Sequence, residues 1–350
     1  MSICTAGENI INAGELPACM EALEQLCRSL RRPPKRRMPQ PRMWTEPDRL
    51  HGEVVDAFVF IMQTRGCRWS HRSGCTMCGY NTDSIPNVTE EQLREQLALA
   101  SERYGGEAVV KIFTSGSFLD RREVPPEVQR MVLQTFFEHA GRVVVETRPS
   151  YVPGLDDIAD VVPAGKTLTV AMGLESANDR VLEYAINKGF TYADWQRAAE
   201  QVRDAGFEVK TYVLLKPPFL GEGEAIMDAV ATVDAAAEYS DAVSLNPVAV
   251  HGNTLVEHLW KRGRYRPPWL WSVAAVLEHM AARFDGLITC DVVAGGKERG
   301  AHNCGDCDAE LLRAIEQFTL HEKRDAFEGV SCGCREEWLD SREIGWFLQG

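Results

Sequence analysis

The stretch Val54-Val-Asp-Ala-Phe-Val-Phe-Ile-Met62 is followed at once by Gln-Thr-Arg-Gly-Cys67-Arg-Trp-Ser-His-Arg-Ser-Gly-Cys75-Thr-Met-Cys78. Its first half is a short apolar run rich in β-branched and aromatic residues, which predicts a buried β-strand. Its second half predicts a loop that holds three cysteines just after the end of that strand. In β/α proteins, this end of a strand is where catalytic groups are usually placed.

Five further apolar runs follow the first, and helical patterns separate them. The predicted strands are 54–62, 108–114, 143–147, 168–174, 209–215 and 242–245. The predicted helices are 90–104, 126–139, 155–161, 179–187, 192–205, 222–239 and 270–283. Near-continuous apolar strands that alternate with helices predict an α/β fold with a parallel sheet covered on both faces. Six such units form either a partial barrel or an open, doubly wound sheet.

The remaining sequence divides into two flanking segments. Residues 1–48 contain a predicted helix, 16–30, and an arm rich in proline and arginine. Residues 49–285 carry the β/α pattern, and residues 286–350 form a cysteine-rich segment with a helix from Ala309. We therefore expect a barrel domain with an N-terminal helical and basic extension and a small C-terminal metal-binding segment.

Composition and charge narrow the function classes. The chain has 350 residues, 45% of them hydrophobic, and a net charge of −13, so the molecule as a whole repels nucleic acid. No apolar run is long enough to span a bilayer, and Glu8 and Glu15 stand where a signal peptide needs apolar residues. These features predict a cytoplasmic protein without a membrane partner. Eleven cysteines in such a protein favour metal binding over disulfides.

The loop cysteines Cys67, Cys75 and Cys78 can ligate three irons of a 4Fe–4S cluster and leave the fourth iron open. A fourth cysteine would close the cluster and restrict it to electron transfer. Two other interpretations stay open: a zinc site with His71 as the fourth ligand, and unrelated buried thiols.

This arrangement resembles the radical SAM superfamily over about residues 50–285. The usual signature has three residues between the first two cysteines, whereas this chain has seven, as in the elongator-like branch. The motif Glu146-Thr-Arg148-Pro149 also resembles that branch. The resemblance implies a 4Fe–4S cluster and S-adenosylmethionine, with Glu146 bonded to the ribose hydroxyls. The S-adenosylmethionine site that it implies, at successive strand ends, consists of Ser115, Gly116, Ser117, Glu146, Arg148, Glu175, Ser176, Lys216 and Asn246.

A second cysteine group lies near the C-terminus. Cys304 and Cys307 form one close pair, and Cys332 and Cys334 form another, which suits a structural tetrahedral zinc site. An auxiliary iron–sulfur cluster and free thiols are the alternatives, with His302 and Cys290 as possible substitute ligands. We regard Cys4, Cys19 and Cys27 as incidental.

The basic arm contains most of the concentrated positive charge. Its predicted tRNA-binding residues are Arg31, Arg32, Lys35, Arg36 and Arg37. The alternatives are a solvated flexible arm and a docking segment for a protein partner. The aromatic loop with Tyr265, Trp269 and Trp271 either packs in the barrel or stacks on an exposed base.

The segments 212–219 and 244–271, with the C-terminal cysteine pairs, are similar to the radical SAM subunit family of archaeosine synthase. This resemblance implies a C–N lyase that acts on tRNA bearing a lysine adduct of 7-cyano-7-deazaguanine through a 5′-deoxyadenosyl radical. It also implies two partners, the subunit that attaches the lysine and an electron donor. Other possibilities are a radical SAM enzyme for another RNA or a free metabolite, an acetyl-transfer protein, and a non-catalytic zinc-binding RNA adaptor.

Overall fold

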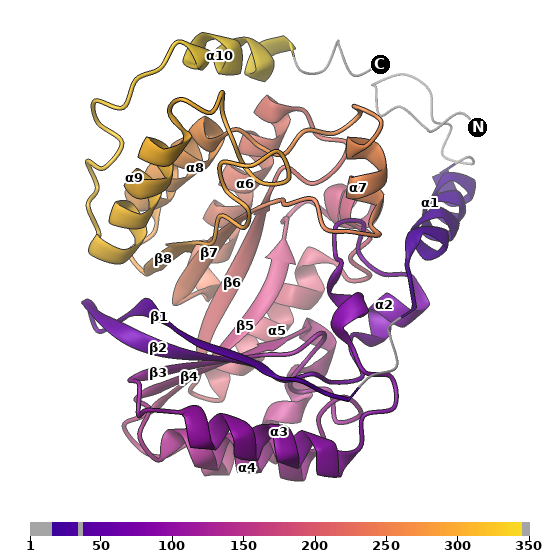
Figure 1. The fold of residues 1–350 in the computed structure, drawn as a ribbon, viewed down its shortest axis with the longest axis vertical. Coiled ribbons are helices and arrows are strands. Elements are labelled where there is room, and N and C mark those ends of the chain that lie inside the picture. Colours follow the sequence, from indigo (N-terminus) through magenta and orange to yellow (C-terminus); the bar gives the residue numbers. More distant parts are fainter. Residues whose placement is uncertain (1–15, 34–37, 345–350) are drawn as a thin grey trace.

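The computed structural model describes residues 16–33 and 38–344, and its centre is one sheet of eight strands (Figure 1). The strands follow one another across the sheet in chain order. Strands β2 to β8 run parallel, and β1 is antiparallel to β2. The predicted partial α/β barrel is confirmed. The strands are β1 Arg42–Leu50, β2 Glu53–Ile61, β3 Val109–Phe113, β4 Arg142–Thr147, β5 Thr167–Glu175, β6 Glu208–Leu215, β7 Ala242–Pro247 and β8 Leu287–Cys290.

Two of these strands, β1 and β8, were not among the six that the sequence predicts. β1 arises from a stretch that contains charges and Pro47, and a proline is tolerated there because β1 is an edge strand. β8 has only four residues and lies against β7. The sheet therefore extends beyond the predicted barrel segment at both of its ends.

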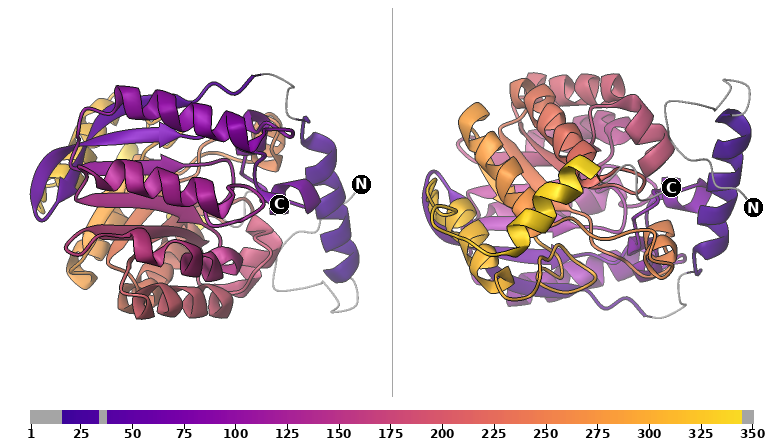
Figure 2. Two further views of the ribbon diagram at one scale, coloured as in Figure 1. Left: turned by 90° about the horizontal axis from the view of Figure 1, so that it is seen from below. Right: turned by 90° about the horizontal axis from the view of Figure 1, so that it is seen from above.

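Helices cover the outer face of the sheet (Figure 2). Most begin and end within two residues of the predicted positions, but two segments differ. Residues 155–161 belong to the 3₁₀ turns η2 and η3 instead of an α-helix. A π-helix, η4, replaces the predicted α-helix 179–187. The elements are α3 Glu90–Arg103, α4 Pro126–Phe137, η2 Pro149–Asp157, η3 Ala159–Val161, η4 Val181–Ile186, α5 Tyr192–Asp204, α6 Glu222–Ala236, η5 Ala237–Tyr239 and α8 Leu270–Arg283.

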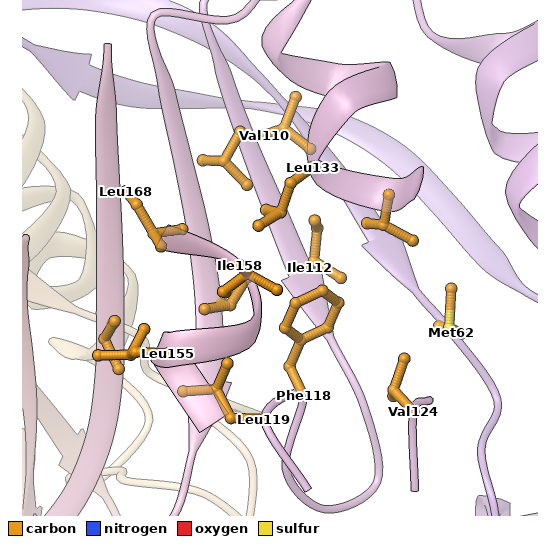
Figure 3. Packing of buried hydrophobic residues seen from close by; sticks show 14 of the residues in the cluster. Met62, Val110, Ile112, Phe118, Leu119, Val124, Leu133, Leu155, Ile158 and Leu168 are labelled. Atoms are coloured by element: carbon orange, nitrogen blue, oxygen red, sulfur yellow. The ribbon is translucent and has the colours of Figure 1, made fainter. Parts of the chain in front are cut away.

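The larger hydrophobic core lies between the sheet and these helices. Figure 3 shows Ile112 of β3 and Leu133 of α4 facing one another, with Phe118 close to both. A smaller apolar cluster lines the inner face of the barrel and includes Val144. Polar side chains occupy the rest of that inner face, which leaves charged groups inside the barrel.

The terminal segments pack at two different places on the barrel. Helix α1, Leu16–Leu30, lies beside α2, Arg68–Arg72, and contacts α7, Leu255–Trp260 (Figures 1 and 2). Helix α9, Asp308–His321, packs against α8 and β8, and α10, Cys334–Ile344, packs against α6. Within the described residues, no helix is both long and apolar enough to cross a membrane.

Candidate active site and C-terminal metal centre

The three loop cysteines converge beyond the carboxyl end of β2. Cys67 directly precedes α2, and Cys78 lies just before η1, Tyr80–Asp83. Burial raises the pKa of the Cys67 thiol and raises that of Cys78 to about 12, and negative charge on Cys75 would raise both further. The three sulfurs are thus close enough to interact electrostatically. Metal ions replace the protons of such thiols, which makes binding a proton-releasing event.

The spacing of these sulfurs fits a cluster better than a single ion. Among the described residues, the one group of three or more potential metal ligands whose atoms all lie within 4.8 Å of one another is the C-terminal one. The three loop sulfurs do not form such a compact group in the described structure. Because each thiolate of an iron–sulfur cluster binds a different iron, a wide spread is what such a cluster requires.

The cysteine loop is anchored on residues more than a hundred positions later in the chain. Thr76 Oγ1 donates to the carbonyl of Ala185 in η4 at 2.7 Å. Asn187 Nδ2 donates to the carbonyl of Gly74 at 2.9 Å, and Trp69 Nε1 donates to the carbonyl of Asn187 at 2.8 Å. Asn187 has a positive φ of 55° at the end of the π-helix. This anchor was not predicted, because nothing in the sequence links two segments so far apart.

The predicted turn 115–117 lies directly on the cysteine loop. A Cβ atom on Gly116 would be 2.7 Å from the backbone nitrogen of Cys67, so the turn requires glycine. Behind it lies buried Glu123, which accepts bonds from the Ser117 amide at 2.7 Å and from Thr64 Oγ1 at 2.5 Å. Burial raises the pKa of Glu123 to about 7. Glu123 was not predicted, since in sequence it looks like one more charge in an exposed turn.

Arg148 connects the predicted turn to the segment that follows η4. Its backbone amide donates to Ser117 Oγ at 3.1 Å, and its guanidinium donates to the carbonyl of Lys188 at 2.6 Å. The guanidinium also lies over the ring of Phe190, with its central carbon 5.1 Å from the ring centroid. The nearby positive charge acts to lower the pKa of the Cys67 thiol, although burial has the larger effect. A cation placed here favours thiolate over thiol.

Two predicted carboxylates lie at neighbouring strand ends, β4 and β5. Loss of hydration raises the pKa of Glu146 to about 7, while a hydrogen bond from the hydroxyl of Tyr212 opposes this rise. Glu175, with a positive φ of 72°, accepts from Lys188 Nζ at 2.7 Å. Asn246 lies half-buried at the end of β7. The structure thus places Glu146, Glu175 and Asn246 at the same edge of the barrel as the cysteines.

Ser176 and Lys216 are also at this edge, but their polar atoms are paired with α6. Ser176 Oγ donates to Asp228 at 2.8 Å, and Lys216 Nζ forms a buried ion pair with Glu222 at 2.6 Å. A direct contact of either side chain with a ligand would require these bonds to be exchanged.

Arg31 of the predicted tRNA-binding arm faces inward. Its guanidinium donates to the carbonyl of Ser70 at 2.6 Å and to that of Cys75 at 3.0 Å. Arg31 therefore fastens the end of α1 to the cysteine loop. Arg32 is exposed, and the other predicted arm residues, Lys35, Arg36 and Arg37, lie outside the described residues.

The four C-terminal cysteines come together, as the sequence analysis expected. Cys304 and Cys332 have their sulfurs 3.6 Å apart, and so do Cys307 and Cys334. All four sulfurs lie within 4.8 Å of one another. All four are free thiols, so the group offers four sulfur ligands to a metal ion.

Two side chains donate to these sulfurs and orient them. Trp271 Nε1 lies 3.4 Å from the sulfur of Cys334, and Asn303 Nδ2 lies 3.2 Å from that of Cys307. Such outer donors are typical partners of metal-bound thiolates.

In the aromatic loop, Tyr265, Trp269 and Trp271 are all buried. This burial confirms that the loop packs in the barrel and excludes stacking on an exposed base.

The two histidines considered as alternative metal ligands contact backbone carbonyls instead. The ring of His71 is exposed and contacts the carbonyl of Arg65 at 3.0 Å, and His302 Nδ1 contacts the carbonyl of Gly300 at 2.8 Å. Cys27 is buried in α1, in an apolar cluster against which Cys75 packs.

Comparison with known proteins identifies relatives of this chain. A model of the Radical SAM superfamily matches residues 61–230. Archaeosine synthase subunit beta of Methanosarcina acetivorans is 38% identical over 314 residues, which cover 88% of this chain and 91% of that protein. The protein of the same name from Thermococcus kodakarensis is 38% identical over 320 residues, covering 87% and 98%. The solved structure of methylornithine synthase aligns with 92% of this chain and 94% of its own, at 13% identity and a TM-score of 0.48.

The matched superfamily segment contains the cysteine loop and the ends of strands β2 to β6, where most of the site described above is located. The similarity to the two archaeal proteins extends over nearly the whole chain. This chain therefore belongs to the archaeosine synthase subunit beta family of radical SAM proteins.

Proposed function

We propose that this protein is the radical SAM subunit that completes archaeosine in tRNA. It abstracts a hydrogen from the lysine side chain of the 7-cyano-7-deazaguanine adduct and breaks a C–N bond, which leaves archaeosine on the tRNA. The observation that carries this proposal is the 38% identity to two archaeosine synthase beta subunits over nearly their whole length.

Cys67, Cys75 and Cys78 are the residues that would hold the 4Fe–4S cluster. When bound, the cluster with S-adenosylmethionine at its open iron supplies the electron that releases a 5′-deoxyadenosyl radical. The three sulfurs and the glycine turn packed against Cys67 fit a cluster, because the loop leaves no fourth cysteine to close it.

The other strand-end residues would bind S-adenosylmethionine. Glu146 offers a carboxylate to the ribose hydroxyls, and the turn 115–117 offers backbone groups to the methionine end. Tyr212 holds the Glu146 carboxyl in place. Arg148, Glu175, Ser176, Lys216 and Asn246 complete the proposed set by lining or fixing the same edge of the barrel.

We assign the C-terminal cysteines to a structural zinc ion. A Zn–S bond of about 2.3 Å in a tetrahedron places the sulfurs about 3.8 Å apart. The two separations of 3.6 Å are close to this value.

The proposed partners are tRNA, the subunit that attaches the lysine, and an electron donor. The arm residues Arg32, Lys35, Arg36 and Arg37 are candidates for tRNA contact, whereas Arg31 acts within the protein.

The decisive experiment is mass analysis of tRNA nucleosides after anaerobic incubation with reduced protein and S-adenosylmethionine. The substrate is tRNA that already carries the lysine adduct. We expect loss of the adduct and formation of archaeosine and 5′-deoxyadenosine. Turnover of a free amino acid or free base without RNA would contradict the proposal.

A further inference from the structure

Exposed arginines gather where α1 meets the cysteine loop. Arg28 and Arg32 belong to the end of α1 and the residues after it, and Arg65 and Arg72 belong to the cysteine loop and α2. All four side chains are exposed. We call these four residues the α1–α2 face.

Arg31 fixes the two halves of this face to one another. It lies between Arg28 and Arg32 in the chain and donates to the carbonyls of Ser70, in α2, and of Cys75. In the cysteine loop, the ring of His71 contacts the carbonyl of Arg65, which joins that residue to α2. Figures 1 and 2 show α1 and α2 side by side on one flank of the barrel.

The charges of the α1–α2 face are not neutralised inside the protein. Within the part of the chain that the structure describes, none of its four guanidinium groups has an ion-pair or hydrogen-bond partner. Many other arginines of the protein do pair with acids, among them Arg42, Arg94, Arg121, Arg130 and Arg197. The acids of α1, Glu21 and Glu24, precede Arg28 by seven and four positions, and no ion pair joins either of them to it within the described residues. A free cluster of four arginines is unusual in a protein with a net charge of −13.

We propose that the α1–α2 face binds the phosphate backbone of the substrate tRNA and directs the modified nucleotide to the barrel. This inference rests on the proposed function and extends the predicted RNA contact from the arm to the cysteine loop itself. Exposed guanidinium groups bind phosphate in a forked geometry. Backbone contacts of this kind position an RNA without reading its sequence. Because Arg65 and Arg72 flank Cys67, RNA held here lies next to the cluster loop.

The test compares the tRNA affinity of two variants with that of the wild type. The first carries Arg28→Gln, Arg32→Gln, Arg65→Gln and Arg72→Gln. The control carries Arg103→Gln and Arg283→Gln, two exposed arginines at the ends of α3 and α8 that lead into the opposite edge of the sheet. Binding of fluorescently labelled tRNA is measured by anisotropy at several salt concentrations, with the iron content of each preparation determined.

We expect the four-residue variant to bind tRNA at least about tenfold more weakly. Its slope of log affinity against log salt should fall by about 0.7–0.9 for each phosphate that the variant no longer binds. The control should match the wild type. Unchanged affinity and slope would overturn the inference, as would an equal effect in the control or weaker binding accompanied by iron loss. Unchanged tRNA affinity together with failure to bind the lysine-attaching subunit would likewise overturn it in favour of a protein interface. Failure of the proposed function differs from all of these, because wild-type protein would then bind tRNA and form no archaeosine.

Discussion

At the carboxyl ends of the strands, which we call the mouth of the barrel, one loop carries the three thiols of Cys67, Cys75 and Cys78. Near the C-terminus, four thiols come from two short turns. The mouth thiols do not form a compact ligand group within the described structure, and their loop is held by distant residues such as Asn187 and Arg31. The C-terminal sulfurs lie within 4.8 Å of one another, and two of them begin or precede helices α9 and α10.

This difference suits the two sites to different roles, a chemical role for the mouth cysteines and a stabilising role for the C-terminal cysteines. A spread set of three ligands leaves one metal position open to a small molecule, and so it suits chemistry. A compact set of four fills the coordination sphere of one ion, and so it suits the fixing of a fold. The number and spacing of sulfurs distinguish the two sites before any metal is identified.

The largest expected effect comes from removing the three mouth cysteines. Replacing Cys67, Cys75 and Cys78 together with alanine should abolish iron binding and all cleavage of S-adenosylmethionine, while zinc is retained. Metal analysis and assay of 5′-deoxyadenosine check this result. Cys290→Ala, a change at a thiol outside both sites, is the control. Formation of 5′-deoxyadenosine by the triple variant would remove the distinction between the two sites.

Next in size is the loss of one C-terminal ligand. Cys304→Ser should release zinc and destabilise the protein by about 3 kcal/mol, which lowers Tm by roughly 4 °C in a chain of this size. Iron should remain bound at the mouth. Calorimetry and metal analysis give the two readouts. If the purified wild type contains more than four irons and no zinc, the C-terminal site is an auxiliary cluster.

The anchoring of the mouth loop gives a third test. Arg31→Ala removes two charge-assisted hydrogen bonds to loop carbonyls, worth about 1.5–3 kcal/mol each when made to a charged group. The cluster should consequently be lost faster in air, as followed by visible absorption. Arg32→Ala, at an exposed neighbour, should show the wild-type rate. Equal rates for Arg31→Ala and wild type would mean that the loop needs no support from α1.

Glu146 tests the cofactor side of the mouth. Glu146→Gln keeps the shape of the side chain but weakens a charge-assisted bond by about 1–2 kcal/mol, or roughly tenfold in S-adenosylmethionine affinity. Iron content should be unchanged. Glu208→Gln, at the opposite end of the barrel lining, should bind S-adenosylmethionine normally. Unaltered affinity in Glu146→Gln would move the ribose contact to Glu175.

The smallest effect concerns Asp228, which joins α6 to the end of β5. Burial raises its pKa from 3.8 to about 6. A raised carboxyl pKa stabilises the folded state fully below pH 4, and that contribution is lost as the pH rises through about 6. Asp228→Asn removes this loss. Between pH 5 and pH 7.5, the free energy of unfolding of the wild type should therefore fall by about 1 kcal/mol relative to that of the variant, as measured by urea unfolding. A constant difference at both pH values would contradict the raised pKa.

The sequence predicted the parts of this protein that rest on local patterns. Apolar runs identified six parallel strands, and paired cysteines identified the C-terminal group. β1 escaped prediction because its pairing partner, not its own charged and proline-containing sequence, makes it a strand. The π-helix η4 also escaped, since an apolar helical pattern does not distinguish its hydrogen bonding from that of an α-helix.

Residues that act through burial or long-range contact were beyond the reach of sequence. Glu123 reads as a surface charge until the fold covers it. Arg31 reads as part of a basic arm, yet its guanidinium faces two backbone carbonyls. The roles proposed for the strand-end residues came from family resemblance, and their contacts with S-adenosylmethionine stay predictions.

The anchoring of the cysteine loop on Asn187 also sets an order of events during synthesis. Asn187 and Ser73, which it contacts, are separated by 114 positions in the chain. The ribosome therefore delivers all three mouth cysteines long before it delivers the residue that holds their loop. Until β5 and η4 have emerged, the loop lacks the contacts with Ala185 and Asn187 that complete its anchoring. A fully anchored loop is therefore available to a cluster only after more than half of the chain has been made.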